Sequence, residues 1–80
     1  MIYLAEFQLF NHVDGRWHRV LNVLSESDTF RRIVEVTNPN ETYHNSIVGE
    51  LIQAEFPHLT IKKLQISKMI SDRGTQNAQL

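Results

Sequence analysis

Residues 1–20 read MIYLAEFQLFNHVDGRWHRV, and this stretch decides the fold because it predicts two antiparallel strands joined by a tight turn. From residue 3 to residue 9 every second side chain is apolar, which is the period of a strand that buries one face. The Asp-Gly pair at 14–15 is a strong hairpin signal, because glycine adopts positive φ freely and aspartate tolerates it. Residues 17–24 are then expected to form the returning strand.

The length of the hairpin loop sets which side chains face each other. A two-residue loop at 14–15 would place Phe7 opposite Asn22, whereas a three-residue loop at 13–15 would place it opposite Leu21. The second register matches apolar with apolar, and a slip of one residue would turn every side chain to the other face. We therefore expect the three-residue loop, closed by a glycine bulge.

Residues 25–39, SESDTFRRIVEVTNP, satisfy two periods at once. A capping pair at Ser25 and Asp28 and apolar residues at helical spacing favour a short helix over about 28–36. The β-branched alternation of IVEVT favours a strand instead. We expect the helix, which must end before Pro39 because proline disfavours helical conformation in the preceding residue.

The second half of the chain is less ambiguous. Residues 38–57, NPNETYHNSIVGELIQAEFP, predict an amphipathic helix that Asn40 caps and Pro57 ends. Residues 58–70, HLTIKKLQISKMI, predict a third strand. Its apolar parity switches at Lys62-Lys63, which indicates a bulge or a strand end there.

These elements predict an α+β fold, a small two-layer sandwich in the order β-β-α-α-β. An antiparallel hairpin and a late third strand would carry one or two helices packed on one face. We expect a single domain over residues 1–70 and a flexible C-terminal tail over 71–80, which is polar.

The composition excludes several classes of protein. The chain has no cysteine, so disulfides and cysteine-ligated zinc are excluded. No apolar run reaches the roughly 20 residues that span a bilayer, and no signal peptide is recognisable, so we expect a cytoplasmic protein without a membrane partner. His12 and His18 would lie near each other across the hairpin, but no carboxylate pair joins them to complete a metal site, and no nucleophile motif or glycine-rich phosphate loop is present. We expect no metal, no cofactor and no enzymatic activity.

The residues with the strongest recognition character lie around the hairpin. Phe10 falls on the strand face opposite the predicted core, and Trp17 and Arg19 are residue types that anchor interfaces. Trp17 either caps the end of the core or is exposed as an anchor, and the sequence supports both. We expect a protein partner, or a homodimer formed through an edge strand or through the outer face of the sheet.

The alternative is an RNA-binding or ribosome-associated module. Five basic residues, of which the three lysines lie on or after the predicted third strand, could contact phosphates. They are Arg31, Arg32, Lys62, Lys63 and Lys68. The net charge of −1 provides no global attraction to nucleic acid, so a solvated strand face is the simpler interpretation.

The predicted layout over residues 3–66 is similar to that of small phage inhibitors of bacterial RNA polymerase and of a small archaeal ribosomal protein. This resemblance is one of layout and transfers no functional residue. It implies a compact protein that acts by binding. We therefore expect a non-enzymatic protein-binding module, an accessory or inhibitor protein of possible phage origin.

Overall fold

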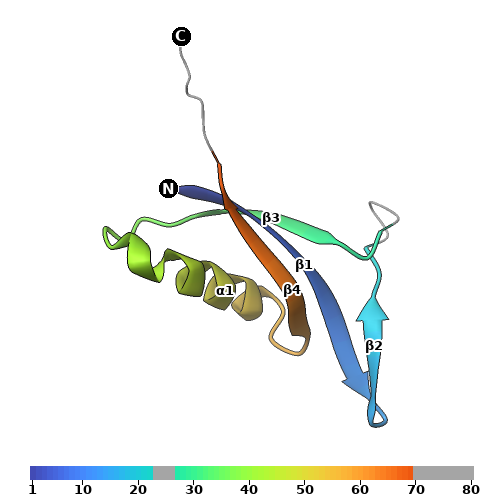
Figure 1. The fold of residues 1–80 in the computed structure, drawn as a ribbon. Coiled ribbons are helices and arrows are strands. Elements are labelled where there is room, and N and C mark those ends of the chain that lie inside the picture. Colours follow the sequence, from blue (N-terminus) through green and yellow to red (C-terminus); the bar gives the residue numbers. More distant parts are fainter. Residues whose placement is uncertain (23–26, 70–80) are drawn as a thin grey trace.

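A computed structural model of the chain describes residues 1–22 and 27–69, which form four strands and one α-helix (Figure 1). The elements in chain order are β1 (Ile2–Val13), β2 (Arg16–Val20), β3 (Phe30–Glu35), the 3-10 turn η1 (Glu41–Tyr43), α1 (His44–Glu55) and β4 (Thr60–Lys68). The α+β class is confirmed, but the order is β-β-β-α-β with a single α-helix, so the predicted order and the second helix were wrong. The tail predicted at 71–80 lies outside the described residues. Within these ranges no helix has the length and apolar character needed to cross a membrane.

β1 is the centre of the sheet and pairs in antiparallel fashion with all three other strands. Residues 3–6 of β1 pair with both β3 and β4, and residues 9–10 pair with both β2 and β4. Because a strand has only two edges, β2 and β3 must follow one another along one edge, and β4 lies along the other. One long strand therefore organises the whole sheet.

The hairpin between β1 and β2 has a two-residue loop. Val13 pairs with Arg16, and the two residues between them, Asp14 and Gly15, have φ of 54° and 74°. Two successive positive φ values define a type I′ turn, whose twist matches that of the flanking strands. The expected three-residue loop was therefore wrong, because the Asp-Gly pair satisfies the tighter turn without a bulge.

This register would place Phe7 opposite Asn22, but that pairing does not form, because β3 replaces β2 along this edge of β1. The ladder between β1 and β2 ends at Leu9 and Val20, and Asn22 leaves the sheet to form backbone hydrogen bonds with Ser27. β3 then takes over the same edge, so that Phe30 rather than Asn22 lies opposite Phe7. The expected helix over 28–36 was wrong, because the remaining edge of β1 recruits this β-branched segment as a strand.

β4 contains the predicted irregularity. Lys62 pairs with Gln8 and Gln65 pairs with Glu6, so two residues of β4 oppose one residue of β1. Lys63 has a φ of 55°, in the left-handed region that a bulged residue often occupies. The extra residue corrects the parity, so apolar side chains on both sides of the bulge reach the same face of the sheet. Of the two predicted alternatives, a bulge or a strand end, the structure shows the bulge.

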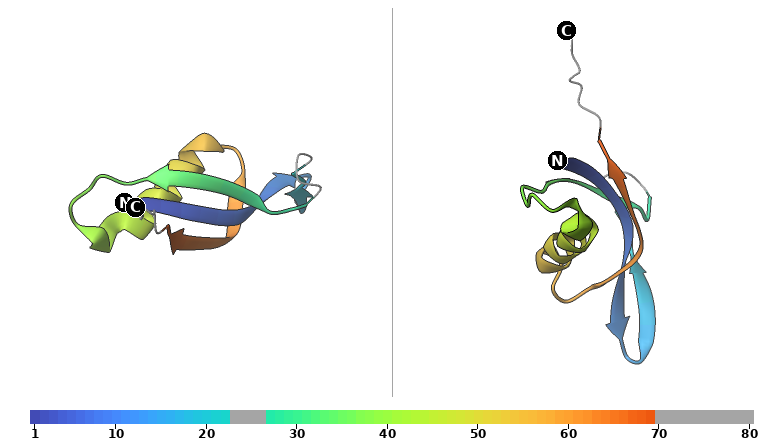
Figure 2. Two further views of the ribbon diagram at one scale, coloured as in Figure 1. Left: turned by 90° about the horizontal axis from the view of Figure 1, so that it is seen from above. Right: turned by 60° about the vertical axis from the view of Figure 1, so that its left-hand side comes forward.

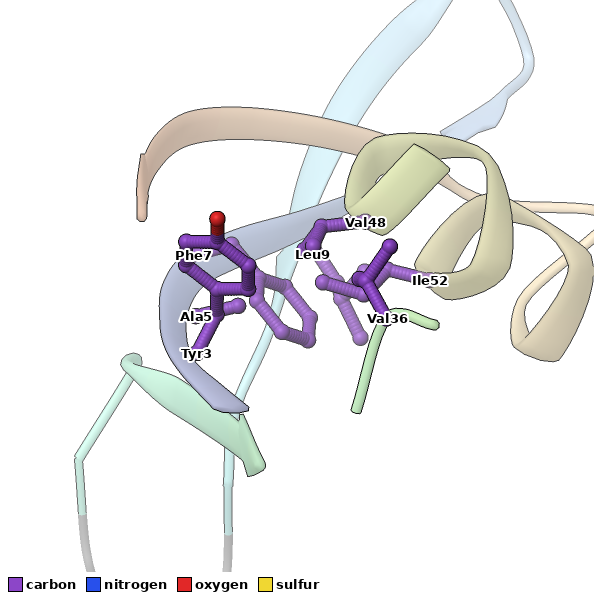
Figure 3. Close-up of a cluster of buried hydrophobic side chains, with 7 residues drawn as sticks. All are labelled: Tyr3, Ala5, Phe7, Leu9, Val36, Val48 and Ile52. Atoms are coloured by element: carbon purple, nitrogen blue, oxygen red, sulfur yellow. The ribbon is translucent and has the colours of Figure 1, made fainter. Parts of the chain in front are cut away.

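α1 packs on one face of the sheet, which we call the inner face (Figure 2). The side chain of Asn40 accepts a hydrogen bond from the backbone N–H of Thr42 and so caps η1, which leads into α1, whereas the predicted cap on the α-helix itself is absent at Tyr43. Alternate side chains of β1 meet Val48 and Ile52 of α1 in the core (Figure 3). The buried apolar residues are Tyr3, Ala5, Phe7, Leu9, Val36, Val48 and Ile52. The molecule thus has two layers, and its other sheet face, the outer face, is free of helix (Figure 2).

Candidate functional site

The outer face of the sheet collects aromatic and cationic side chains near the hairpin. Phe10 and His12 of β1 point to this face, because they alternate with the buried residues of the same strand. Their partners across the ladder are Arg19 and Trp17 of β2, which therefore lie on the same face. Lys62 joins them from β4, beside Gln8 on the other edge of β1. We call Phe10, His12, Trp17, Arg19 and Lys62 the hairpin cluster.

Ring and cation contacts hold the hairpin cluster together. The rings of His12 and Trp17 lie with their centroids 4.5 Å apart and their planes at 33°. The Lys62 ammonium is 4.9 Å from the centroid of the Trp17 ring and 5.3 Å from that of Phe10. The guanidinium of Arg19 is 5.9 Å from the Phe10 ring. Contacts of this kind are worth about 0.5–1 kcal/mol each at exposed sites, so they order the side chains without burying them.

Trp17 remains open to solvent in this arrangement. It is 51% exposed, and the tip of the hairpin extends beyond the region covered by α1 (Figure 1). The structure therefore excludes the alternative in which Trp17 caps the core. Phe10 is half-buried beside it, and Arg19 forms an ion pair of 2.6 Å with Asp28. All three residues proposed from the sequence as a binding site thus lie in one exposed cluster.

A second group of apolar side chains lies at the other end of the outer face. Leu4 of β1 pairs with Ile33 of β3, which is 68% exposed, and Ile2 is exposed next to them. The ion pair between Arg31 and Glu6, at 2.8 Å, separates this group from the hairpin cluster. The outer face is therefore apolar at both ends and charged in the middle.

The basic residues of the RNA alternative do not form one surface. Arg31 lies on the outer face and is paired with Glu6, whereas Arg32 pairs with Ala5 in the ladder and so points to the inner side. The remaining contacts disperse the set further. Arg32 binds Glu55 at 2.7 Å, Lys68 lies 3.9 Å from Glu41, Lys63 is the exposed bulge residue, and Lys62 belongs to the hairpin cluster. Three of the five cations are thus opposed by carboxylates.

One buried polar side chain, that of His44, was not predicted from the sequence. His44, which begins α1, is 3% exposed, with its Nδ1 2.7 Å from the hydroxyl of Tyr3 and its Nε2 2.6 Å from the carbonyl oxygen of Asn38. A carbonyl only accepts, so Nε2–H donates to Asn38, and the Tyr3 hydroxyl is the hydrogen-bond partner of Nδ1. His44 therefore links the helix to β1. No sequence signal distinguishes it from the surface histidines.

The described residues contain no group of three or more side chains placed to hold a metal ion. His12 instead contributes to the hairpin cluster through its ring contact with Trp17.

No known protein family matches the chain, and neither a curated protein nor a solved structure is significantly similar to it. The observed order of elements also differs from the layout that was compared with phage and ribosomal proteins.

Proposed function

We propose that this chain is a non-enzymatic protein-binding module whose contact surface is the hairpin cluster. The observation that carries the proposal is the state of Trp17, which is half exposed yet held in place by His12 and Lys62. An aromatic side chain ordered before binding loses little conformational entropy when a partner covers it. Tryptophan and arginine are also the residues most often found to dominate binding energy at interfaces.

The proposed role is that of an accessory or inhibitor protein acting on a partner in the cytoplasm. The support for this location is that the sequence has no cysteine and so forms no disulfide, and small domains without disulfides are typical of reducing compartments. The role itself requires only a stable scaffold that presents one contact surface. The two-layer fold, with its core on the inner face, meets that requirement.

RNA binding is the weaker candidate. Bases stack on open aromatic faces, but His12 and Lys62 both lie against the Trp17 ring. The other basic residues are divided between two faces, and most have carboxylate partners. A homodimer through the free edge of β4 is also less favoured, because a bulge at Lys63 and the charge of Lys63 and Lys62 both oppose the pairing of another strand at this edge.

A capture experiment with two matched variants tests the proposal. The chain, the Trp17→Ala variant and the Tyr43→Ala variant are immobilised and exposed to lysate of the source organism, with and without nuclease. Tyr43 is a suitable control because it is an aromatic residue that is 56% exposed, at the end of η1 and away from the hairpin.

We expect one protein that the wild type and Tyr43→Ala retain after nuclease treatment and that Trp17→Ala loses. The purified partner should then bind directly with the same dependence on Trp17. Equal capture by all three chains would refute the proposal. Recovery of RNA or ribosomes that disappears with nuclease would favour the alternative.

A further inference from the structure

We infer that the hairpin cluster binds an acidic peptide segment of its partner, one that places carboxylates next to an apolar side chain. This inference rests on the proposed function and specifies its partner. Its basis is the position of Lys62, whose ammonium lies over the rings of both Trp17 and Phe10. Among the described residues Lys62 has no carboxylate within ion-pair distance, in contrast to Arg19 in the same cluster.

The charges of the chain are unevenly distributed, although their sum is only −1. The segment 41–55, which forms η1 and α1, contains three glutamates and neither lysine nor arginine. Around the tip of the hairpin and the bulge of β4 lie four cations, Arg16, Arg19, Lys62 and Lys63, against two acidic residues, Asp14 and the Asp28 that pairs with Arg19. A partner approaching the hairpin cluster therefore meets local positive charge, and complementary charge speeds and orients such an encounter.

The apolar part of the ligand follows from the two rings. Trp17 is half exposed and Phe10 is half-buried, so a ligand of carboxylates alone would leave this apolar surface in water. An apolar side chain that packs against the exposed parts of the rings, beside His12 and Lys62, would also remove water from around the Lys62 ammonium, which strengthens its attraction to a carboxylate. The two contacts therefore support each other only when one ligand provides both.

Recognition should depend on side chains rather than on addition of a strand. The edge of β4 next to Lys62 is interrupted by the bulge, where Lys63 has a φ of 55°. An added strand needs a continuous row of backbone donors and acceptors, which this edge does not provide. The identity of the ligand's side chains should then decide its affinity.

Selection from a random peptide library displayed on phage tests the inference. The immobilised targets are the wild type, Lys62→Glu, Trp17→Ala and the control Lys68→Glu. Lys68 is an exposed lysine on the same strand as Lys62, at the opposite end of β4. The selected peptides are synthesised, and their affinities are measured at low and high salt.

We expect the wild type and Lys68→Glu to select peptides that are rich in acidic residues and contain an aromatic or aliphatic side chain. Lys62→Glu should weaken their binding by about tenfold or more and should shift selection toward basic peptides. Trp17→Ala should lose both kinds of peptide, and high salt should weaken the acidic ones.

Other results would overturn the inference in distinguishable ways. Peptides that depend on Trp17 but show no excess of acidic residues, or that Lys62→Glu binds equally well, would refute the acidic ligand and leave the proposed function standing. Absence of any peptide that depends on Trp17 would refute a linear ligand, and the capture experiment would still judge the proposed function separately. Self-association of the chain, or binding of single-stranded RNA, that Trp17→Ala abolishes would identify a different occupant.

Discussion

Tyr3 and His44 are 41 residues apart in the chain, yet the Tyr3 hydroxyl and the His44 Nδ1 are 2.7 Å apart in the buried region between β1 and α1. Their rings meet edge to face, with centroids 5.6 Å apart. The second ring nitrogen of His44 is satisfied by the carbonyl of Asn38. The start of the helix is thus attached to the central strand by a polar contact as well as by apolar packing.

Removing the Tyr3 hydroxyl should therefore destabilise the fold. Tyr3→Phe leaves a buried ring nitrogen of His44 without its partner, which costs about 1–3 kcal/mol. Tyr43→Phe is the control, because Tyr43 is 56% exposed and should change stability by less than about 0.5 kcal/mol. Urea unfolding followed by circular dichroism measures both. Equal stability of the two variants would contradict the role of the contact.

The strand assignment of β3 predicts that Phe30 and Ile33, which lie on opposite faces of the strand, contribute very differently to stability. The Phe30 ring stacks against Phe7 at 6.0 Å and meets Phe56 at 6.3 Å, whereas Ile33 is 68% exposed. Phe30→Ala should cost about 2–4 kcal/mol, and Ile33→Ala should cost less than about 0.5 kcal/mol. Thermal unfolding distinguishes them. In a helix, residues 30 and 33 would lie on the same face and would be buried to a similar extent. Similar losses of stability at both positions would therefore argue against the strand.

Two glycines should respond in opposite ways to alanine. A Cβ added to Gly49 in α1 would meet only the Leu64 Cδ2, at 3.8 Å, which is ordinary van der Waals contact. Gly49→Ala should therefore stabilise the chain by up to about 1 kcal/mol through its higher helix propensity. Gly15→Ala should destabilise it by about 1–2 kcal/mol, because Gly15 has a φ of 74°. Denaturant midpoints test both, and destabilisation by Gly49→Ala would show that the helix lies closer to β4 than described.

The bulge residue Lys63 predicts that substitution and deletion differ. Lys63→Gly should be neutral or stabilising by up to about 1 kcal/mol, because glycine adopts the observed φ of 55° without strain. Deletion of Lys63 should cost about 2–4 kcal/mol, because it restores strict alternation and turns Ile61 away from the inner face. Differential scanning calorimetry compares the two. A deletion variant as stable as the wild type would show that the bulge is not needed for parity.

Trp17 should be accessible to small quenchers in the folded chain. It is the only tryptophan and is 51% exposed, so acrylamide should quench its fluorescence almost as well as in the unfolded chain. Trp17→Ala should change the free energy of unfolding by less than about 1 kcal/mol. A protected, blue-shifted emission would contradict the exposed position and would indicate that another surface covers the ring.

Several elements could be predicted because their signals are local. Alternation in residues 3–9 defines a strand with one buried face, and the Asp-Gly pair at 14–15 defines its turn. Asn40 and Pro57 enclose the helix, and the change of apolar parity at 62–63 reveals the bulge. Each signal depends on residues that are neighbours in the sequence, so one sequence is sufficient to read it.

β3 and the register of the β1–β2 hairpin could not be predicted, because the local sequence is compatible with more than one structure in both places. The segment FRRIVE fits a helix and a strand, and only the unoccupied edge of β1 beside residues 2–7 selects the strand. The loop length was misjudged for a related reason. The expected register assumed that β2 alone had to match Phe7, whereas Phe30 of β3 fills that place.

The candidate site shows the same division. Phe10, Trp17 and Arg19 were recognisable by residue type, and Phe10 also by its place on the strand face opposite the predicted core. That Lys62 belongs to the same cluster could not be predicted, because its contact with Trp17 crosses the sheet from β4 to β2. The burial of His44 could not be predicted either, since its partner Tyr3 is 41 residues away in the sequence.

The sequence by itself determined the α+β class, the first strand, the position of its turn, the helix between Asn40 and Pro57 and the change of apolar parity at 62–63, because short-range periodicity and backbone preferences specify these features. Only the tertiary structure decided that residues 30–35 are a strand, that Trp17 is exposed and that Lys62 lies over its ring. These outcomes depend on which edge of β1 each later segment occupies. That choice follows from burying apolar area over the whole domain, a quantity that no local pattern contains.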